Sequence, residues 1–126
     1  MTPQKDQWTL DMSAGPIFEQ IAKNVHQMLA RGALRPGDKL PSARDLAAVL
    51  NVNPNTIVHA YAQLEASGVI EKRRGLGTFV REDASIQGLR HDMLDQAARV
   101  YADEGRQLDA TIQDAIDALK EVWDAS

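Results

Sequence analysis

The sequence of residues 41–61 is PSARDLAAVLNVNPNTIVHAY, and its pattern predicts two helices separated by a short turn. Ser42 is of a residue type that caps helix starts, and apolar residues follow it at helical spacing. Asn53 is a second cap, and Pro54 after it suits the first turn of a helix, where its missing N–H costs nothing. Two helices joined this closely are typical of a helix-turn-helix motif.

The residues on either side of this motif complete a small domain. Apolar residues recur at helical spacing between residues 16 and 32, which predicts a helix ahead of the motif. Residues 69–80 have the pattern of two short strands joined by a basic, glycine-containing turn. A helix-turn-helix followed by such a hairpin describes a winged helix, which we assign to residues 1–82, with residues 1–13 as a loosely ordered arm.

The C-terminal part, residues 83–126, has a different pattern, in which acidic and apolar residues alternate and glycine and proline are rare. The apolar spacing predicts two helices with a break at residues 103–106. A hairpin of this size cannot bury two apolar faces by itself, so it needs either the winged domain or another copy of the chain. The predicted fold class is therefore α+β and mainly helical, a winged helix-turn-helix followed by a two-helix hairpin. The positions assigned to a dimer interface are Leu89, Met93, Val100, Tyr101, Leu108, Ile112, Ile116, Leu119 and Trp123.

Charge also separates the two parts of this 126-residue chain. Residues 1–81 hold 10 Lys or Arg and 7 Asp or Glu, whereas residues 82–126 hold 4 and 11. The net charges of +3 and −7 favour a nucleic-acid partner for the basic part, although two solvated surfaces would also explain them. Cysteine is absent, which excludes disulfide scaffolds and thiolate chemistry. No apolar run reaches the roughly 20 residues that span a bilayer, so we expect a cytoplasmic protein with no membrane partner.

Polar residues at the start of the second motif helix are candidates for reading DNA bases. In a helix-turn-helix these residues enter the major groove, and here they are Asn53, Asn55, Thr56 and, one turn later, His59. An Asn side chain pairs with both N6 and N7 of adenine, and Thr can contact a thymine methyl. Asn53 has an equal alternative role as the helix cap alone, and His59 as a solvated side chain.

Further candidates lie at the start of the shorter helix and along the hairpin. Ser42 and the free N–H groups near it suit a phosphate, and Arg44 can reach a phosphate or a guanine edge. The alternative for Arg44 is an ion pair with Asp45. A wing that rests on phosphates or enters the minor groove is the hypothesis for the hairpin, against a solvated basic turn. Its residues are Lys72, Arg73, Arg74, Gly75 and Gly77.

An enzyme is the weaker interpretation of this sequence. The three histidines, His26, His59 and His91, lie on three different predicted elements and form no pair at helical spacing. No phosphate-binding loop or dinucleotide fingerprint occurs, so we expect no catalytic residue, metal or cofactor. An adaptor whose acidic tail docks another protein is the other rival. A tail that forms a heterocomplex but no homodimer would favour the adaptor, and turnover lost on mutating a histidine would favour the enzyme.

Residues 16–80 resemble the DNA-binding domain of the GntR family of bacterial transcription regulators. The resemblance lies mainly in LRPGDKLPS at residues 34–42 and GLGTFV at residues 75–80. It implies a dimeric regulator that binds double-stranded operator DNA and carries a C-terminal effector or oligomerisation domain. A tail this short, with two predicted helices, resembles the YtrA subfamily, whose members are usually repressors. The effector, the operator and the regulated genes stay open.

The resemblance also carries contacts over to individual positions. Arg44 matches the family's DNA-contacting arginine in the second helix of the winged domain, and Arg74 with Gly75 matches the wing tip. Asn53, Asn55 and Thr56 fall on contact positions of the recognition helix. Pro54 departs from the arginine that many members carry there, so their operator consensus does not transfer to this chain.

Overall fold

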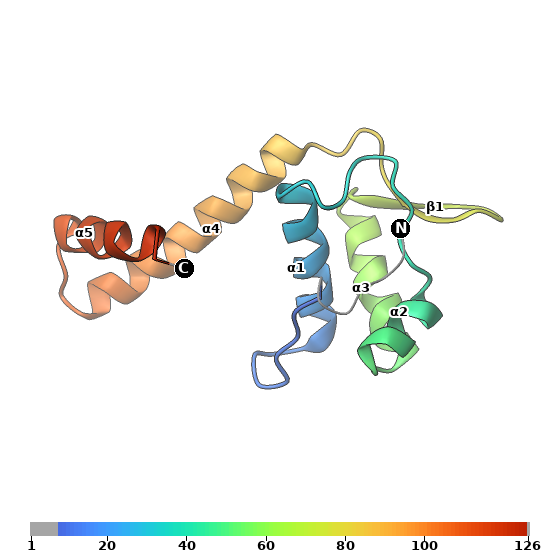
Figure 1. Ribbon diagram of the computed structural model, residues 1–126, viewed down its shortest axis with the longest axis horizontal. Coiled ribbons are helices and arrows are strands. Elements are labelled where there is room, and N and C mark those ends of the chain that lie inside the picture. The colour runs from blue at the N-terminus through green and yellow to red at the C-terminus, as the bar shows by residue number, and fades with distance from the viewer. Residues whose placement is uncertain (1–7, 126) are drawn as a thin grey trace. The chain divides into compact units, whose positions relative to one another are not determined.

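The computed structural model describes residues 8–125, which form two compact units with their sequence boundary between Gln87 and Gly88. The second unit contains α5 and all but the first two residues of α4. This arrangement is the mainly helical winged helix-turn-helix with C-terminal helices that the sequence predicts (Figure 1). None of the helices among these residues has the length and apolar character needed to cross a bilayer. The elements are α1 (Ile17–Ala30), α2 (Ala43–Leu50), α3 (Pro54–Ala66), β1 (Ile70–Arg73), β2 (Gly77–Val80), α4 (Ile86–Gln107) and α5 (Ile112–Trp123).

Local capping explains where the two motif helices begin and end. Ser42 Oγ accepts a hydrogen bond from the Asp45 backbone N–H at 3.1 Å, which starts α2. Asn51 ends α2 in the left-handed conformation, with φ of 56°, a geometry that Asn tolerates better than most residues. Asn53 Oδ1 then accepts from the Asn55 N–H at 2.9 Å and starts α3.

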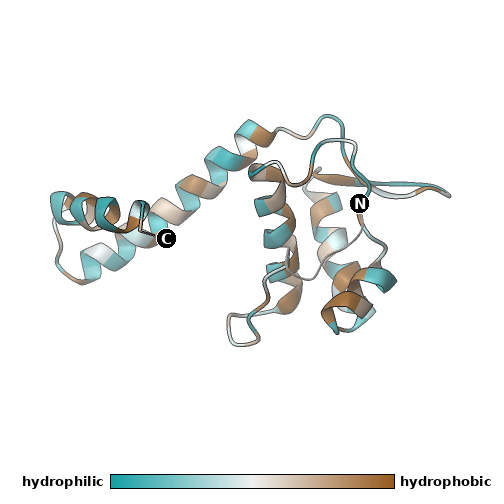
Figure 2. Cartoon of the chain, viewed as in Figure 1, coloured by the Kyte–Doolittle hydropathy of each residue, from teal (hydrophilic) through white to brown (hydrophobic). Residues whose placement is uncertain are grey.

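The core of the first unit lies between α3 and the elements packed on it. Helices α1 and α2 both pack against α3, and β1 packs against its end. Figure 2 shows the apolar residues of these helices gathered on their facing sides. The large side chains of this core are almost fully shielded from solvent, and they include Ile21, Val25, Met28, Leu29, Leu34, Leu40, Leu46, Ile57, Leu64, Ile70 and Val80.

The segment before α2 pairs with β2 through one isolated β-bridge. The Leu40 N–H donates to the Thr78 carbonyl at 2.8 Å, and the Val80 N–H donates to the Asp38 carbonyl at 2.8 Å. Lys39 lies between these bonds and forms a β-bridge with Phe79. The wing is therefore tied by its main chain to the segment that leads into the helix-turn-helix.

The N-terminal arm is more ordered than the sequence predicts. Trp8 is buried, and the Asn24 amide pairs with the Thr9 peptide group, accepting from its N–H at 3.0 Å and donating to its C=O at 2.8 Å. The Gln20 amide makes the same pair of bonds with Asp11, at 2.8 and 2.7 Å. The expectation of a loose arm is thus wrong for residues 8–13. Two side-chain amides of α1 bond the backbone of the arm as a neighbouring strand would, and this holds the arm in place. Its part over residues 1–7 lies outside the described residues.

The break expected at residues 103–106 is also misplaced, because α4 continues through Gly105 to Gln107. The chain turns later, at Asp109, which has a φ of 59°. Thr111 then starts α5 by a capping box with Asp114, in which each side chain bonds the other's backbone N–H. Leu108, which the sequence pattern assigns to the last helix, lies in the connecting turn.

The second unit buries little of its own apolar surface. No residue of α4 or α5 is buried, and one hydrogen bond between the helices runs from the Tyr101 hydroxyl to the Ala115 carbonyl at 2.9 Å. Leu89 and Met93 are half-buried. The other positions assigned to a dimer interface are exposed: Val100, Tyr101, Leu108, Ile112, Ile116, Leu119 and Trp123.

Candidate nucleic-acid interface

The first turn of α3 presents polar groups on the side away from the core. Ile57 and Tyr61 are buried, so Asn55 projects into solvent and Thr56 is half-exposed. The Asn55 side chain makes no hydrogen bond with any residue between 8 and 125, so its amide is available to a base. Asn53 differs, because its Oδ1 is already used as the cap and only its Nδ2 can donate.

His59 lies one turn further along α3 but has a partner within the protein. Its ring stacks on Phe18 of α1, with centroids 3.8 Å apart and an angle of 14° between the planes. The sequence alone does not show this contact, because the two residues lie on different helices. His59 is still exposed, so its ring edge faces solvent while one ring face is covered.

At the start of α2, a hydroxyl group already accepts a hydrogen bond, whereas a guanidinium group has no ion-pair partner among the described residues. Ser42 Oγ serves as the helix cap. Arg44 is exposed and, among the described residues, makes no ion pair. The intrahelical pair with Asp45 that the sequence allows is therefore not formed. The guanidinium is free to bind a phosphate or a guanine edge.

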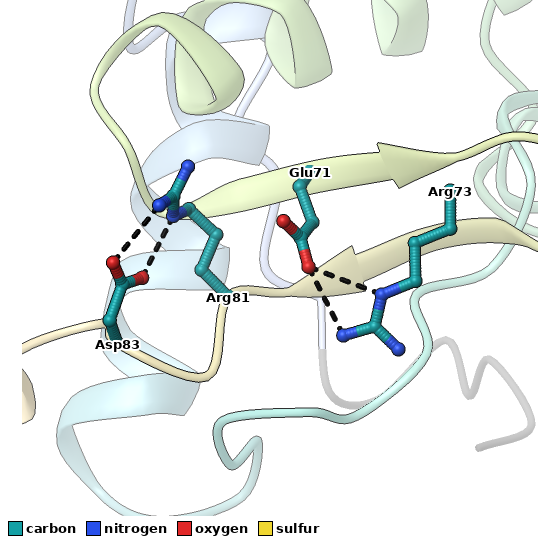
Figure 3. A network of polar contacts seen from close by, with 4 residues as sticks. All are labelled: Glu71, Arg73, Arg81 and Asp83. Carbon is teal, nitrogen blue, oxygen red and sulfur yellow. Dashed lines mark hydrogen bonds and ion pairs between the residues drawn. The ribbon is translucent and has the colours of Figure 1, made fainter.

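The two arginines of the hairpin have different surroundings. Arg73 pairs with Glu71, at 3.1 Å from both Nε and Nη2 to Oε1, and its guanidinium lies 4.3 Å from the centre of the Phe79 ring. Figure 3 shows this pair on the hairpin, beside the two bonds that join Arg81 to Asp83. The Arg81 guanidinium lowers the pKa of Asp83, so that pair stays ionised at neutral pH. Glu71 likewise neutralises the charge of Arg73.

Arg74 instead lies exposed at the tip of the wing. The Leu76 N–H donates to the Arg73 carbonyl at 2.9 Å and closes a tight turn around Arg74 and Gly75. Gly75 has a φ of +76°, a conformation that glycine adopts without strain. Among the described residues Arg74 has no ion-pair partner, so its charge is available to a ligand.

A groove of about 300 Å³ lies between the wing and the two motif helices. Lys39 and Lys72 line it on the hairpin side, Ser42 at the start of α2, and Val58 on α3. The sequence analysis misses Lys39 as a site residue. The signal that finds it is the pairing of residues 37–40 with β2, which brings Lys39 onto the wing.

Comparison with known proteins agrees with this geometry. Residues 17–80, about half of the chain, match the family described as bacterial regulatory proteins, gntR family. The chain belongs to the GntR family. Its likeness to YtrA, together with the short helical tail, places it in the YtrA-like subfamily of these DNA-binding transcription regulators.

The known proteins similar to this GntR-family chain include a repressor, a regulator of solved structure and a DNA-binding domain solved with an operator. The HTH-type transcriptional repressor YtrA of Bacillus subtilis is 47% identical over 57% of this chain and 55% of its own. A GntR family transcriptional regulator from Listeria monocytogenes is 35% identical, with a TM-score of 0.82 over 89% of this chain and 98% of its own. The DNA-binding domain of AraR, solved in complex with operator ORX1, is 27% identical, with a TM-score of 0.51 over 56% of this chain and 86% of its own.

Proposed function

We propose that this GntR-family regulator is a homodimeric repressor that binds a palindromic or nearly palindromic operator. The observation that carries the proposal is the set of free polar groups Arg44, Asn55 and Arg74 on the three elements of the winged domain. The likeness to the YtrA repressor and to AraR, whose domain binds operator ORX1, supports it. A protein that represses from chromosomal DNA acts in the cytoplasm.

The candidate contacts have different roles in this proposal. Asn55 and Thr56 read bases in the major groove, and Arg44 binds a guanine edge or a phosphate. Arg74 and Gly75 place the wing tip on the backbone or in the minor groove. Supporting roles remain for the residues that already hold partners in the protein or shape the wing, namely Ser42, Asn53, His59, Arg73 and Gly77.

The tail supplies the dimer interface in this proposal, because its apolar residues have no cover within their own unit. Ile116 and Leu119 lie one turn apart on α5, and Trp123 follows one further turn on. Pairing two tails would bury these side chains and fix the half-site spacing at about 34–36 Å or a multiple of it. An effector, where one acts, changes DNA affinity only if it binds one arrangement of the two winged domains better than another.

The first experiment is a fluorescence-anisotropy titration of the full chain with the DNA upstream of its own gene, over a salt series. We expect affinity about 10³-fold or more above that for an unrelated duplex, and a steep negative salt slope. Equal, weak binding to both duplexes would contradict specific recognition at that site. It would favour the adaptor, whose acidic tail binds another protein.

Two substitutions test the contact surface. Arg44→Ala and Asn55→Ala should each weaken operator binding by about 1–3 kcal/mol and leave the fold intact. Arg31→Ala and Gln63→Ala are the matched controls, because each removes an exposed side chain of the same type at the end of α1 or later in α3. Unchanged affinity in both test variants would rule out this surface.

The dimer is tested by ending the chain after Gln87, since the residues before it contain the whole buried core. Sedimentation should show a folded monomer with much weaker operator affinity than the full chain. A shortened chain that still forms dimers would show that the tail is not the interface.

A further inference from the structure

We propose that Val58 of α3 reads the C5 methyl group of an operator thymine, in the base pair that Asn55 reads or in the next one. This inference rests on the proposed DNA binding and deepens it, because it names a specificity-determining residue and the chemical group that it recognises. Val58 adds an apolar contact to the polar candidates of the recognition helix, which are Asn53, Asn55, Thr56 and His59.

Val58 is an apolar side chain that the winged unit leaves uncovered. Among the described residues of α1, α2 and α3, it is the one large apolar side chain that is exposed, with an exposed fraction of 51%. Ile57 and Tyr61, on the adjoining face of α3, are buried in the core. Valine is also a weaker helix former than alanine, because its branched β-carbon restricts the χ1 angle. Core packing and helix propensity thus give valine no advantage at this position.

Helix geometry places Val58 beside the base-reading candidate Asn55. Side chains three positions apart are neighbours on a helix surface, and both of these residues are exposed. The helical rise separates them by about 4.5 Å along the axis, while successive bases of a DNA strand are about 3.4 Å apart. A helix that lies in the major groove therefore brings the two side chains to the same base pair or to neighbouring ones.

The surroundings of Val58 suit a position inside the DNA interface. Val58 lines the groove between α3, the start of α2 and the wing, and among the described residues no carboxylate lines that groove. Ala43, which also lines it, directly precedes Arg44, a side chain with no ion-pair partner within residues 8–125. Val58 therefore lies where three elements that carry candidate DNA contacts come together.

The thymine methyl is the apolar group that base pairs display in the major groove. It distinguishes thymine from the other bases there, and apolar side chains recognise it by direct contact. A valine in a helix strongly prefers one χ1 rotamer, so its two γ-methyl groups need little further ordering when they bind. Thr56, which is half-exposed, also carries a methyl group, so the test has to separate these two residues.

The test replaces thymine by deoxyuridine, one position at a time, in DNA that the full chain selects from a random pool. Deoxyuridine pairs as thymine does and lacks only the C5 methyl group. We expect one position per half-site at which the replacement weakens wild-type binding about three- to fourfold, and about tenfold when both half-sites are changed. The same replacement should have little effect on the affinity of Val58→Ala.

Three control measurements separate the methyl contact from other causes. Alanine is the better helix former, so Val58→Ala should unfold at a urea concentration similar to that of the wild type. Thr56→Ser removes the methyl group of the neighbouring candidate and should leave the deoxyuridine effect in place. Met12→Ala removes an exposed apolar side chain of the arm and should change neither the affinity nor the deoxyuridine effect.

A second base analogue locates the two contacts relative to each other. 7-Deazaadenine lacks N7, one of the two adenine atoms that an Asn side chain pairs with. The adenine at which this analogue weakens the wild type but not Asn55→Ala should lie in the same base pair as the Val58-dependent thymine or in the next one. A larger separation would overturn the placement of Val58 beside Asn55 on the DNA.

Three further outcomes separate the failures. Specific wild-type binding, with no position at which the deoxyuridine effect depends on Val58, would overturn the thymine assignment and leave DNA recognition standing. Loss of the deoxyuridine effect in Thr56→Ser but not in Val58→Ala would give the methyl contact to Thr56 and also overturn the assignment. No specific wild-type binding to any DNA of the pool would overturn the proposed function and this inference with it.

Discussion

The winged unit and the tail use similar apolar residues to opposite effect. In the winged unit, Leu46, Ile57 and Val80 are fully covered by their own chain. In the tail, Ile116 and Leu119 remain about 40% exposed, and α4 and α5 bury no residue. The first unit therefore holds its own source of stability, whereas the apolar side chains of the tail have no cover within their own unit, as the proposed dimer requires.

Charge follows the same division. Residues 1–87 hold 10 Lys or Arg and 9 Asp or Glu, a net charge of +1, whereas residues 88–126 hold 4 and 9, a net charge of −5. The acidic tail is repelled by DNA phosphates, which favours approach of the winged unit and keeps the tail free for protein contacts. In the proposed function, DNA binding thus belongs to one unit and assembly to the other.

The largest expected effect comes from replacing one leucine by alanine, first in the winged unit and, in a separate variant, in the tail. Leu46→Ala leaves a cavity in the core and should lower the free energy of unfolding by about 2–5 kcal/mol at every protein concentration. Leu119→Ala should change little in the isolated monomer but weaken self-association. Urea unfolding at several protein concentrations measures both effects. Equal, concentration-independent losses would remove the distinction between the units.

The next effect tests whether the arm belongs to the stable unit. Asn24→Ala removes both bonds to Thr9 and leaves that peptide group without its partner, so the unfolding free energy should fall by about 1–3 kcal/mol. Gln27→Ala, an exposed amide on the same helix, is the control and should change it little. If the two variants unfold alike, the arm contributes nothing to this unit.

A smaller effect is expected in the tail, where α5 depends on its cap rather than on a core. Thr111→Ala should destabilise the start of α5 by about 1 kcal/mol, and Thr111→Ser should retain the cap. Amide hydrogen exchange across residues 112–117 gives the readout. Unchanged protection in the alanine variant would mean that assembly, and not the capping box, holds this helix.

The smallest effect is a pH dependence confined to the winged unit. Burial lowers the pKa of His26 below its ordinary value of 6.5, and its Nε2 has no hydrogen-bond partner among residues 8–125. The neutral ring is therefore favoured in the folded state, and its stabilising contribution is lost as the pH falls below 6.5 through the folded-state pKa. Urea midpoints between pH 7.5 and 5 should fall less steeply for His26→Gln than for the wild type. Identical slopes would assign the pH dependence to other groups.

Local signals made most of the winged fold predictable from sequence. Ser42 and Asn53 cap their helices through residues two or three positions away, so the helix-turn-helix can be inferred without tertiary information. The break in the tail was harder, because Gly105 resembles a helix breaker and yet continues α4. A helix interior tolerates one glycine at a cost of about 1 kcal/mol, and the Thr111 to Asp114 capping box marks the true start of α5.

The features of the site that sequence reasoning missed all depend on contacts between distant segments. Lys39 reaches the wing only through its pairing with Phe79, and His59 meets Phe18 only when α1 packs on α3. The pairing of Arg73 with Glu71 needs the strand alternation, which leaves Arg74 as the free cation at the tip. Residue type therefore identified the candidates, and only the tertiary fold separates the free side chains from those already engaged.

The amide pairs between α1 and the arm have a practical consequence. Gln20 and Asn24 bond to main-chain atoms of Asp11 and Thr9, so these bonds place no demand on the side chains of the arm. Substitutions in the arm should be well tolerated as long as Trp8 stays buried. Met12, which is 81% exposed, then becomes a suitable attachment point for a fluorescent dye, through a cysteine that would be the only one in the chain.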